Sequence, residues 1–150
     1  MRLSRRGFTL IELMVVVTII GILVTIGFPK LQATKMKAIK ASMISDLRNL
    51  VSSQEAFLST YGDYAGSFTT GPEVPGSATS PGVLSFRFSP GNVAVLTRQN
   101  PSSGSGPGWN ATVTNPGIAN TNFSECGVYV GSPSYSPNVG VTREGMPACY

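Results

Sequence analysis

The sequence predicts an α+β protein in which one long N-terminal helix packs on a small antiparallel sheet. Three observations predict this class. An apolar run of helix length opens the chain, an amphipathic stretch without Gly or Pro follows over residues 30–61, and short alternating segments separated by Gly, Pro and Ser fill residues 62–150. A chain of 150 residues is long enough for one small domain with an appendage.

The first element is an apolar run from Phe8 to Phe28 that holds one charged residue, Glu12, and is broken by Pro29. Its helix would be about 31 Å long, the thickness of a bilayer core. A cleaved secretory signal is excluded because the run is too long and no small-residue cleavage site follows it. A plain membrane anchor is an alternative, but it leaves Glu12 unexplained, since a carboxylate inside a membrane helix costs roughly 3 kcal/mol.

The second element is an amphipathic helix over residues 30–61, which Gly62 ends. Its lysines, at the start of the segment, are expected on a solvated or headgroup-facing surface. Its apolar residues recur at steps of three and four and predict one face that packs on a sheet. The stripe consists of Met36, Ile39, Met43, Leu47, Leu50, Phe57 and Tyr61, widened by Ile44, Val51 and Leu58.

The remaining residues, 62–150, are expected to form a head of three to five antiparallel strands. Alternation predicts strands over 83–88 and 93–98, joined as a hairpin by Pro90-Gly91, and further strands over 110–114, 127–130 and 139–143. Such a sheet would bury one face against the helix and leave the other face in water. Trp109 is expected in the core.

Composition excludes several classes of function. Histidine is absent, which removes Ser-His-Asp and Cys-His catalysis and most zinc sites. Three of the eleven basic residues lie within the first six positions, which leaves eight basic against seven acidic residues, too even a balance to attract nucleic acid. No cofactor or metal site is predicted. Cys126 and Cys149, behind a membrane-crossing segment, favour one disulfide over two free buried thiols.

The N-terminal motif is the most specific feature of the chain. Three arginines precede the stretch Gly7-Phe8-Thr9-Leu10-Ile11-Glu12-Leu13-Met14-Val15-Val16. This arrangement resembles the class III signal sequence of type IV pilins and of the pseudopilins of type II secretion systems. The resemblance implies a type IV pilin-like fold, no enzymatic activity, a leader of residues 1–7 that a prepilin peptidase removes between Gly7 and Phe8, and methylation of the new Phe8 amine. It also implies that Glu12 pairs with the N-terminal amine of a neighbouring copy during assembly.

The resemblance carries further expectations. Gly21, Gly27 and Pro29 are expected to kink the helix of the isolated subunit and to mark a stretch that loses its helical structure in the fibre, against the alternative of a simple bend. The two cysteines would bound an exposed C-terminal region. The implied partners are copies of the chain itself, the prepilin peptidase, an inner-membrane assembly platform and the membrane, without specific nucleic acid.

The resulting hypothesis is a major pilin that crosses the inner membrane once, with a cytoplasmic N-terminus, before it joins an extracellular pilus. The chain is divided accordingly into 1–7 (leader), 8–29 (membrane and filament-core helix), 30–61 (amphipathic helix) and 62–150 (head). A pseudopilin of a type II secretion system, a minor pilin and a membrane-anchored binding domain remain as alternatives.

Overall fold

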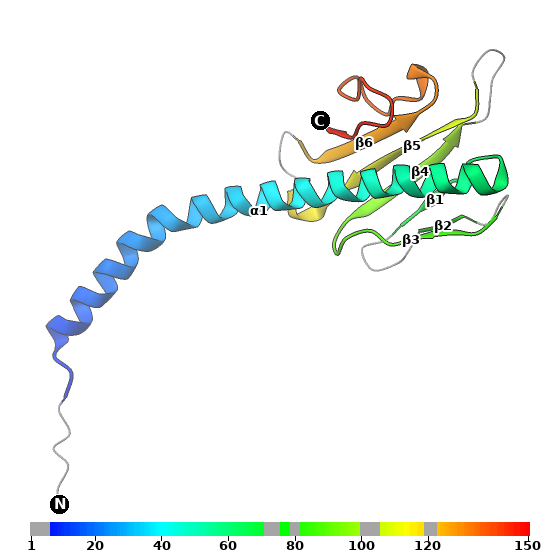
Figure 1. The fold of residues 1–150 in the computed structure, drawn as a ribbon. Helices are drawn as coiled ribbons and strands as arrows, with labels where there is room; N and C mark the ends of the chain where they lie inside the picture. Colours follow the sequence, from blue (N-terminus) through cyan, green and yellow to red (C-terminus); the bar gives the residue numbers. More distant parts are fainter. Residues whose placement is uncertain (1–6, 71–75, 79–81, 100–105, 119–122) are drawn as a thin grey trace, which may run out of the picture. The chain divides into compact units, whose positions relative to one another are not determined.

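The computed structural model describes residues 7–70, 76–78, 82–99, 106–118 and 123–150 (Figure 1). The chain divides into two compact units at Lys35. One long helix and a small antiparallel sheet make up the described residues, which confirms the predicted α+β class.

Helix α1 runs from Leu10 to Tyr61, beginning two residues later than predicted and ending where predicted. Gly62 closes it in the left-handed conformation, with φ of 73°. Its amide donates to the carbonyl of Leu58 at 2.8 Å. A residue with a Cβ is strained in this conformation, so glycine is the favoured helix terminator here.

The main sheet has five antiparallel strands in the order β1-β4-β5-β6-β7. A separate pair of strands, β2 and β3, lies outside it. The predicted strands at 93–98, 110–114 and 127–130 are confirmed as the centre of the main sheet. The bounds are β1 Phe68–Thr69, β2 Gly76–Ala78, β3 Leu84–Phe86, β4 Val93–Gln99, β5 Gly108–Thr114, β6 Glu125–Val130 and β7 Ala148–Cys149, with short 3₁₀ helices η1 at Pro116–Ile118 and η2 at Pro133–Tyr135.

The predicted hairpin between residues 83–88 and 93–98 is wrong. Strand β3 pairs with β2, while β4 pairs with β1 and β5. A turn does exist at Pro90-Gly91, closed by a hydrogen bond from the Asn92 amide to the Ser89 carbonyl. However, the Ser89 amide donates to Asp46 on α1, so the chain entering the turn is bound to the helix rather than to β4.

The predicted strand at 139–143 is also wrong. The Val141 amide donates to the carbonyl of Asn138, which makes a turn. The Ser136 hydroxyl lies within hydrogen-bond distance of the carbonyl oxygens of both Asn138 and Val141. These local bonds take the place of ladder bonds, as is typical of serine- and asparagine-rich segments.

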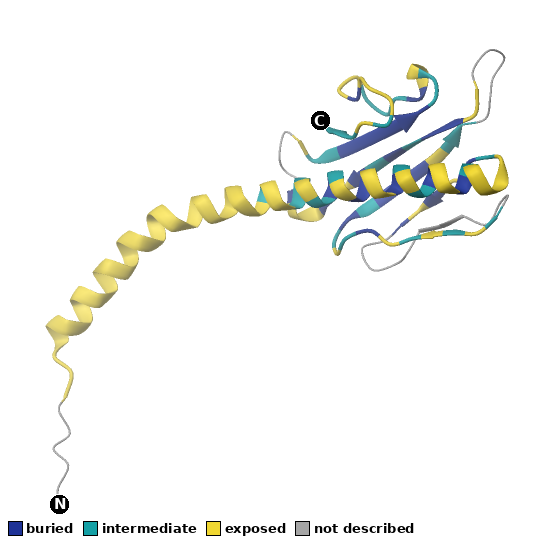
Figure 2. Cartoon of the chain, in the orientation of Figure 1, coloured by how far each residue is buried: buried dark blue, intermediate teal, exposed yellow. Residues whose placement is uncertain are grey.

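The core lies between the sheet and the part of α1 that follows Lys35 (Figure 2). Met43, Leu47, Leu50 and Phe57 of the predicted stripe are buried there and its other residues are half-buried, except Tyr61. Tyr61 is 48% exposed, and its ring centroid lies 4.5 Å from that of Phe57. The helix also buries two polar residues that the stripe did not include, Asp46 and Gln54. The buried apolar residues of this core are Met43, Leu47, Leu50, Phe57, Tyr64, Ala65, Phe68, Phe88, Ala94, Leu96, Trp109, Ala111, Val113, Ile118, Cys126, Val128 and Val130.

The second face of the sheet is not left in water at β6, which corrects the expectation of a one-sided sheet. Val128 and Val130 belong to the helix-side core, and Tyr129, between them, packs instead with Tyr135 and Val141. Successive side chains of a strand point to opposite faces, so β6 is covered on both. The covering segment, between β6 and β7, is closed by a disulfide that joins Cys126 to Cys149.

Candidate functional site: the N-terminal assembly segment

The segment that the sequence singled out begins with Gly7, Phe8 and Thr9, directly before α1. The Thr9 amide and hydroxyl both donate to Oε2 of Glu12, at 2.8 and 2.7 Å, and the Glu12 amide donates back to the Thr9 hydroxyl at 3.3 Å. This is a capping box, in which Thr9 begins the helix and Glu12 secures its first turn.

The capping role of Thr9 was missed in the sequence, although the spacing Thr-x-x-Glu is a recognised signal for it. It adds a second function to Glu12. The carboxylate stabilises the start of its own helix through one oxygen, while Oε1 receives no hydrogen bond from the described residues. Glu12 and Phe8 also line one shallow hollow, together with Ile11, Val15 and Val16.

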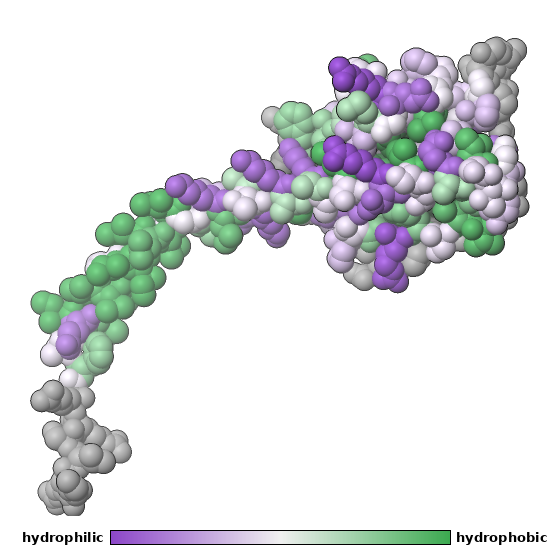
Figure 3. Space-filling model, in the orientation of Figure 1, coloured by the Kyte–Doolittle hydropathy of each residue, from purple (hydrophilic) through white to green (hydrophobic). Residues whose placement is uncertain are grey.

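The helix that follows is apolar and exposed all the way round. Exposure is 79% at Phe8 and 60% at Phe28, and every residue from 7 to 35 is exposed. Figure 3 shows the apolar surface of this stretch. Among the described residues, α1 alone is long and apolar enough to cross a membrane. So much uncovered apolar side chain is unstable in water, so lipid or other copies must cover it.

Gly21, Gly27 and Pro29 all lie inside α1, and the helix is continuous through them. Nothing lies within 4 Å of the position of a Cβ at either glycine. Pro29 has no amide hydrogen, so the carbonyl four residues before it loses its usual helical donor. The kink and the loss of helix on assembly remain predictions.

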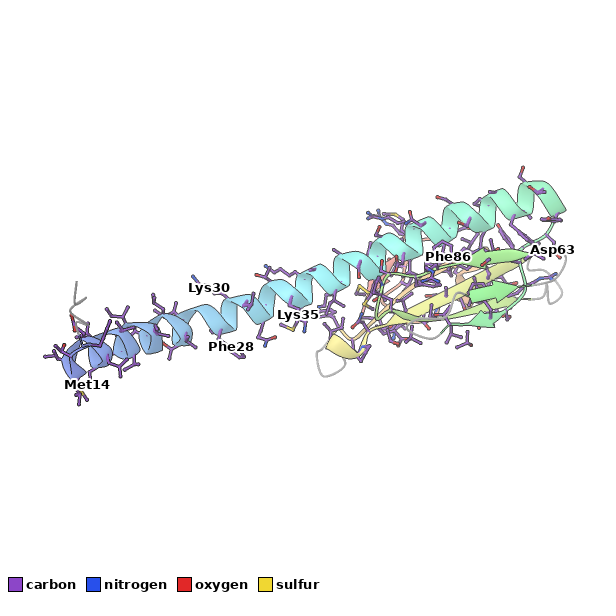
Figure 4. The ribbon with its side chains drawn as sticks, turned by 90° about the horizontal axis from the view of Figure 1, so that it is seen from below. Met14, Phe28, Lys30, Lys35, Asp63 and Phe86 are labelled. Atoms are coloured by element: carbon purple, nitrogen blue, oxygen red, sulfur yellow. A yellow bond between two sulfur atoms is a disulfide. The ribbon has the colours of Figure 1, made fainter. Side chains whose placement is uncertain are left out.

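Four lysines, Lys30, Lys35, Lys37 and Lys40, follow the apolar run that ends at Phe28. Figure 4 labels Lys30 and Lys35 on α1, beyond Phe28. Both are exposed, as is Lys37. This exposure agrees with the predicted solvated or headgroup-facing surface. Of the four lysines in this stretch, Lys40 differs, because its ammonium lies 4.4 Å from the centroid of the Phe123 ring.

Two other sequence-based expectations concern the head. Cys126 and Cys149 are joined, with their strands β6 and β7 paired at these two residues. Trp109 is fully buried in the core. Within the described ranges, no three Cys, Asp or Glu side chains come close enough together to hold a metal ion.

Comparison with known proteins bears on the same N-terminal segment. The family model described as the prokaryotic N-terminal methylation motif matches residues 2–28. The N-terminal segment therefore carries this motif and is similar to that of type IV pilins and type II secretion pseudopilins. Pilins and pseudopilins are structural subunits, not enzymes.

The individual relatives include a type IV pilin and type II secretion system proteins. The type IV major pilin protein PilA of Myxococcus xanthus is 40% identical over 81 residues, which cover 49% of this chain and 37% of the pilin. The type II secretion system core protein G of Klebsiella michiganensis is 43% identical over 56 residues, covering 37% of this chain and 39% of that protein. The core protein G of Escherichia coli is 48% identical over 44 residues, 29% of this chain and 30% of that protein.

The chain therefore spans less than two fifths of the length of these relatives. No solved structure matches the chain.

Proposed function

We propose that this chain is the major subunit of a type IV pilus, a helical surface filament built from many copies. The observation that carries the proposal is the prepilin methylation motif at residues 2–28, followed directly by an apolar helix that is exposed on every side. In the filament, the apolar helices of many copies would cover one another and replace lipid. Hydrophobic burial then supplies the main free energy of assembly.

Maturation follows from the motif. Prepilin peptidase would cut between Gly7 and Phe8 and methylate the Phe8 amine, and the trimmed subunit would wait in the inner membrane with its N-terminus in the cytoplasm. An assembly platform would then extract it into an extracellular fibre. The run of lysines after Pro29 would remain at the headgroups until extraction.

Glu12 supplies the specificity of assembly. Its Oε2 is occupied by Thr9 in its own helix, and its Oε1 is left to accept a hydrogen bond from the Phe8 amine of a neighbouring copy. In an apolar fibre core this attraction is weakly screened, and an unpaired carboxylate there is costly. One charge pair per subunit can thereby set the axial register of neighbouring helices.

The test is electron microscopy of sheared filaments together with mass analysis of the subunit N-terminus. Abundant fibres whose subunits begin with methylated Phe8 are expected. Gly7→Ala should leave the leader in place and abolish fibres. Filaments that retain residues 1–7 would contradict the proposal.

Two substitutions at Glu12 separate its two functions. Glu12→Val removes both charge and cap and should be trimmed normally but assemble poorly. Glu12→Gln keeps an oxygen for Thr9 and removes only the charge, so it should also assemble poorly if pairing with the amine matters. Thr9→Val is the converse control, with the charge kept and the hydroxyl of the cap removed. A Glu12→Gln variant that yields fibres like the wild type would exclude the charge pair.

A pseudopilin of a type II secretion system is the second candidate, supported by the similarity to the core protein G relatives. The same microscopy separates the two functions. Scarce, short filaments that require the secretion genes would favour the pseudopilin, and abundant filaments independent of them would favour the major pilin.

A further inference from the structure

The carboxylates of the head are nearly all paired within the chain. Asp46 accepts hydrogen bonds from Ser89 and Asn92, Glu55 accepts one from the Tyr64 hydroxyl, and Glu144 accepts one from the Gly131 amide. Asp63 forms an ion pair with Arg98. Of the acidic residues that the structure describes after Tyr61 or on the head-facing part of α1, Glu125 alone has a side chain with neither a hydrogen bond nor an ion pair.

Glu125 lies in a hollow of about 390 Å³ at the end of β6. Val93 and Pro116 give the hollow apolar walls, and Thr114, Asn115 and Ser124 complete the lining. Glu125 as a residue is half-buried. The pKa of the nearby Tyr150 is raised to about 12, mainly by the burial of the tyrosine itself and secondly by the charge of Glu125. Within the described residues no cation pairs with Glu125, so a positive charge from outside the single chain would complete this hollow.

In the part of the chain that the structure describes, positive charges without a partner lie on α1. Lys30, Lys35 and Lys37 are exposed and make no hydrogen bond or ion pair within the described residues. No acidic residue occurs between Glu12 and Asp46. A lysine at the membrane surface can pair with lipid headgroups, but extraction into a fibre removes those partners. The assembled chain must then place these ammonium groups in water or beside another carboxylate.

We propose that in the filament the hollow around Glu125 receives the side chain of Lys30, Lys35 or Lys37 from a neighbouring copy of this chain. The inference rests on the filament function proposed above and adds to it a contact between head and helix. The apolar stem of a lysine suits the Val93 and Pro116 walls, and its ammonium would meet the carboxylate at the end of the stem. Opposite charges placed at fixed positions select one register over others and disfavour misaligned copies.

Zero-length carbodiimide cross-linking of intact sheared filaments tests the contact on the unaltered protein, because this reagent joins a carboxylate only to an amine that touches it. A covalent dimer on a denaturing gel is expected. Mass spectrometry of its digest should give a peptide pair that joins Glu125 to one of the three lysines. Glu125→Gln should remove that dimer, and the matched control Glu144→Gln should leave it.

Charge reversal gives an independent measurement. Glu125→Lys should reduce the yield of sheared filaments several-fold, and a second substitution of the contacting lysine by Glu should restore it. Native fluorescence of Trp109 in the variants verifies that the head is folded.

Three outcomes would overturn the contact: filaments whose dimer joins the lysines to another carboxylate, filaments without any cross-link at Glu125, and a failure of all three second substitutions to restore yield. If wild-type cells form no filament at all, the filament function itself fails, which is a different result.

Discussion

Asp46, on the face of α1 that packs on the sheet, accepts a hydrogen bond of 2.7 Å from the side-chain amide of Asn92, just before β4. The amide and hydroxyl of Ser89 donate to the same carboxylate, each at 2.8 Å. Asn92 in turn accepts a hydrogen bond from the side chain of Asn115. Asp46 is only 6% exposed, so this polar network fixes the helix to two loops at one end of the sheet.

Asp46→Ala is expected to lower the free energy of unfolding by about 3 kcal/mol, because the amide and hydroxyl of Ser89 lose their acceptor and the Asn92 side-chain amide keeps only its longer bond of 3.3 Å to Ser42. Trp109 is the only tryptophan and is fully buried, so its fluorescence during denaturant unfolding of the detergent-solubilised chain reports on the head. Asp63→Ala is the matched control, since it breaks a partly exposed ion pair worth about 0–1 kcal/mol. Equal losses in the two variants would contradict the importance of the buried network.

Removal of the disulfide by the double substitution Cys126→Ser and Cys149→Ser is expected to cost about 3 kcal/mol, the value for closing a loop of this size in the unfolded chain. The cysteines are 23 positions apart. The loss should also appear when the wild type is unfolded in the presence of a reductant. Identical unfolding midpoints with and without reductant would show that the bridge adds nothing.

Gly127→Ala tests the covering of the second face of β6. A Cβ at this position would lie 2.7 Å from Cγ of Pro137 and 3.3 Å from the carbonyl oxygen of Ala111. Overpacking of this kind costs typically about 1–3 kcal/mol. Gly106→Ala, where nothing lies within 4 Å of the added atom, should change stability little. A tolerated Gly127→Ala would mean that the segment between β6 and β7 lifts away easily.

The stability of the head should fall at alkaline pH. Burial, followed by the Glu55 charge and its hydrogen bond, raises the pKa of Tyr64 to about 12. An unfolded tyrosine titrates near pH 10, at about its ordinary value. Between these values the folded state holds the proton more tightly than the unfolded state, so the contribution is complete below about pH 10 and is lost as the pH rises towards 12.

Tyr64→Phe should make the fall of unfolding free energy with pH shallower in that window, and adding Tyr150→Phe should flatten it further, because the pKa of Tyr150 is also raised to about 12. Denaturant midpoints measured across the window give the slope. A slope equal to that of the wild type in the double variant would show that other groups cause the alkaline loss.

The sequence predicted what depends on periodicity and on local signals. The apolar run, the stripe through Met43 and Leu50, the stop at Gly62 and the central strands all follow from patterns within a few residues. The errors occur where a residue distant in the sequence accepts a hydrogen bond that the local pattern assigned to a neighbour. Ser89 begins a turn that resembles a hairpin, but Asp46, 43 positions earlier, takes its amide.

The missed residues share one physical cause. The apolar periodicity of a helix places polar side chains in solvent, yet Asp46 and Gln54 are buried because amides of the following loops donate to them. Gln54 accepts a hydrogen bond from the Ala65 amide at 3.0 Å. The second face of β6 was assigned to water for a similar reason, since nothing in the strand itself reveals that residues 133–150 fold over it. In the assembly segment, the charge of Glu12 explains its place in an apolar run but does not reveal its capping bond with Thr9.

The edges of the sheet limit the ways in which copies can combine. Both outer strands, β1 and β7, are two residues long. On either side of β1, the Ser67 side chain accepts a hydrogen bond from the Arg98 amide and the Thr70 side chain accepts one from the Ala94 amide. These amides on the outer edge of β4 are therefore already bound within the chain. Short or occupied edges give incoming strands no template. Crowded heads therefore resist fusing into a continuous cross-β ribbon, and any ordered polymer of this chain must draw its cohesion from elsewhere in the molecule.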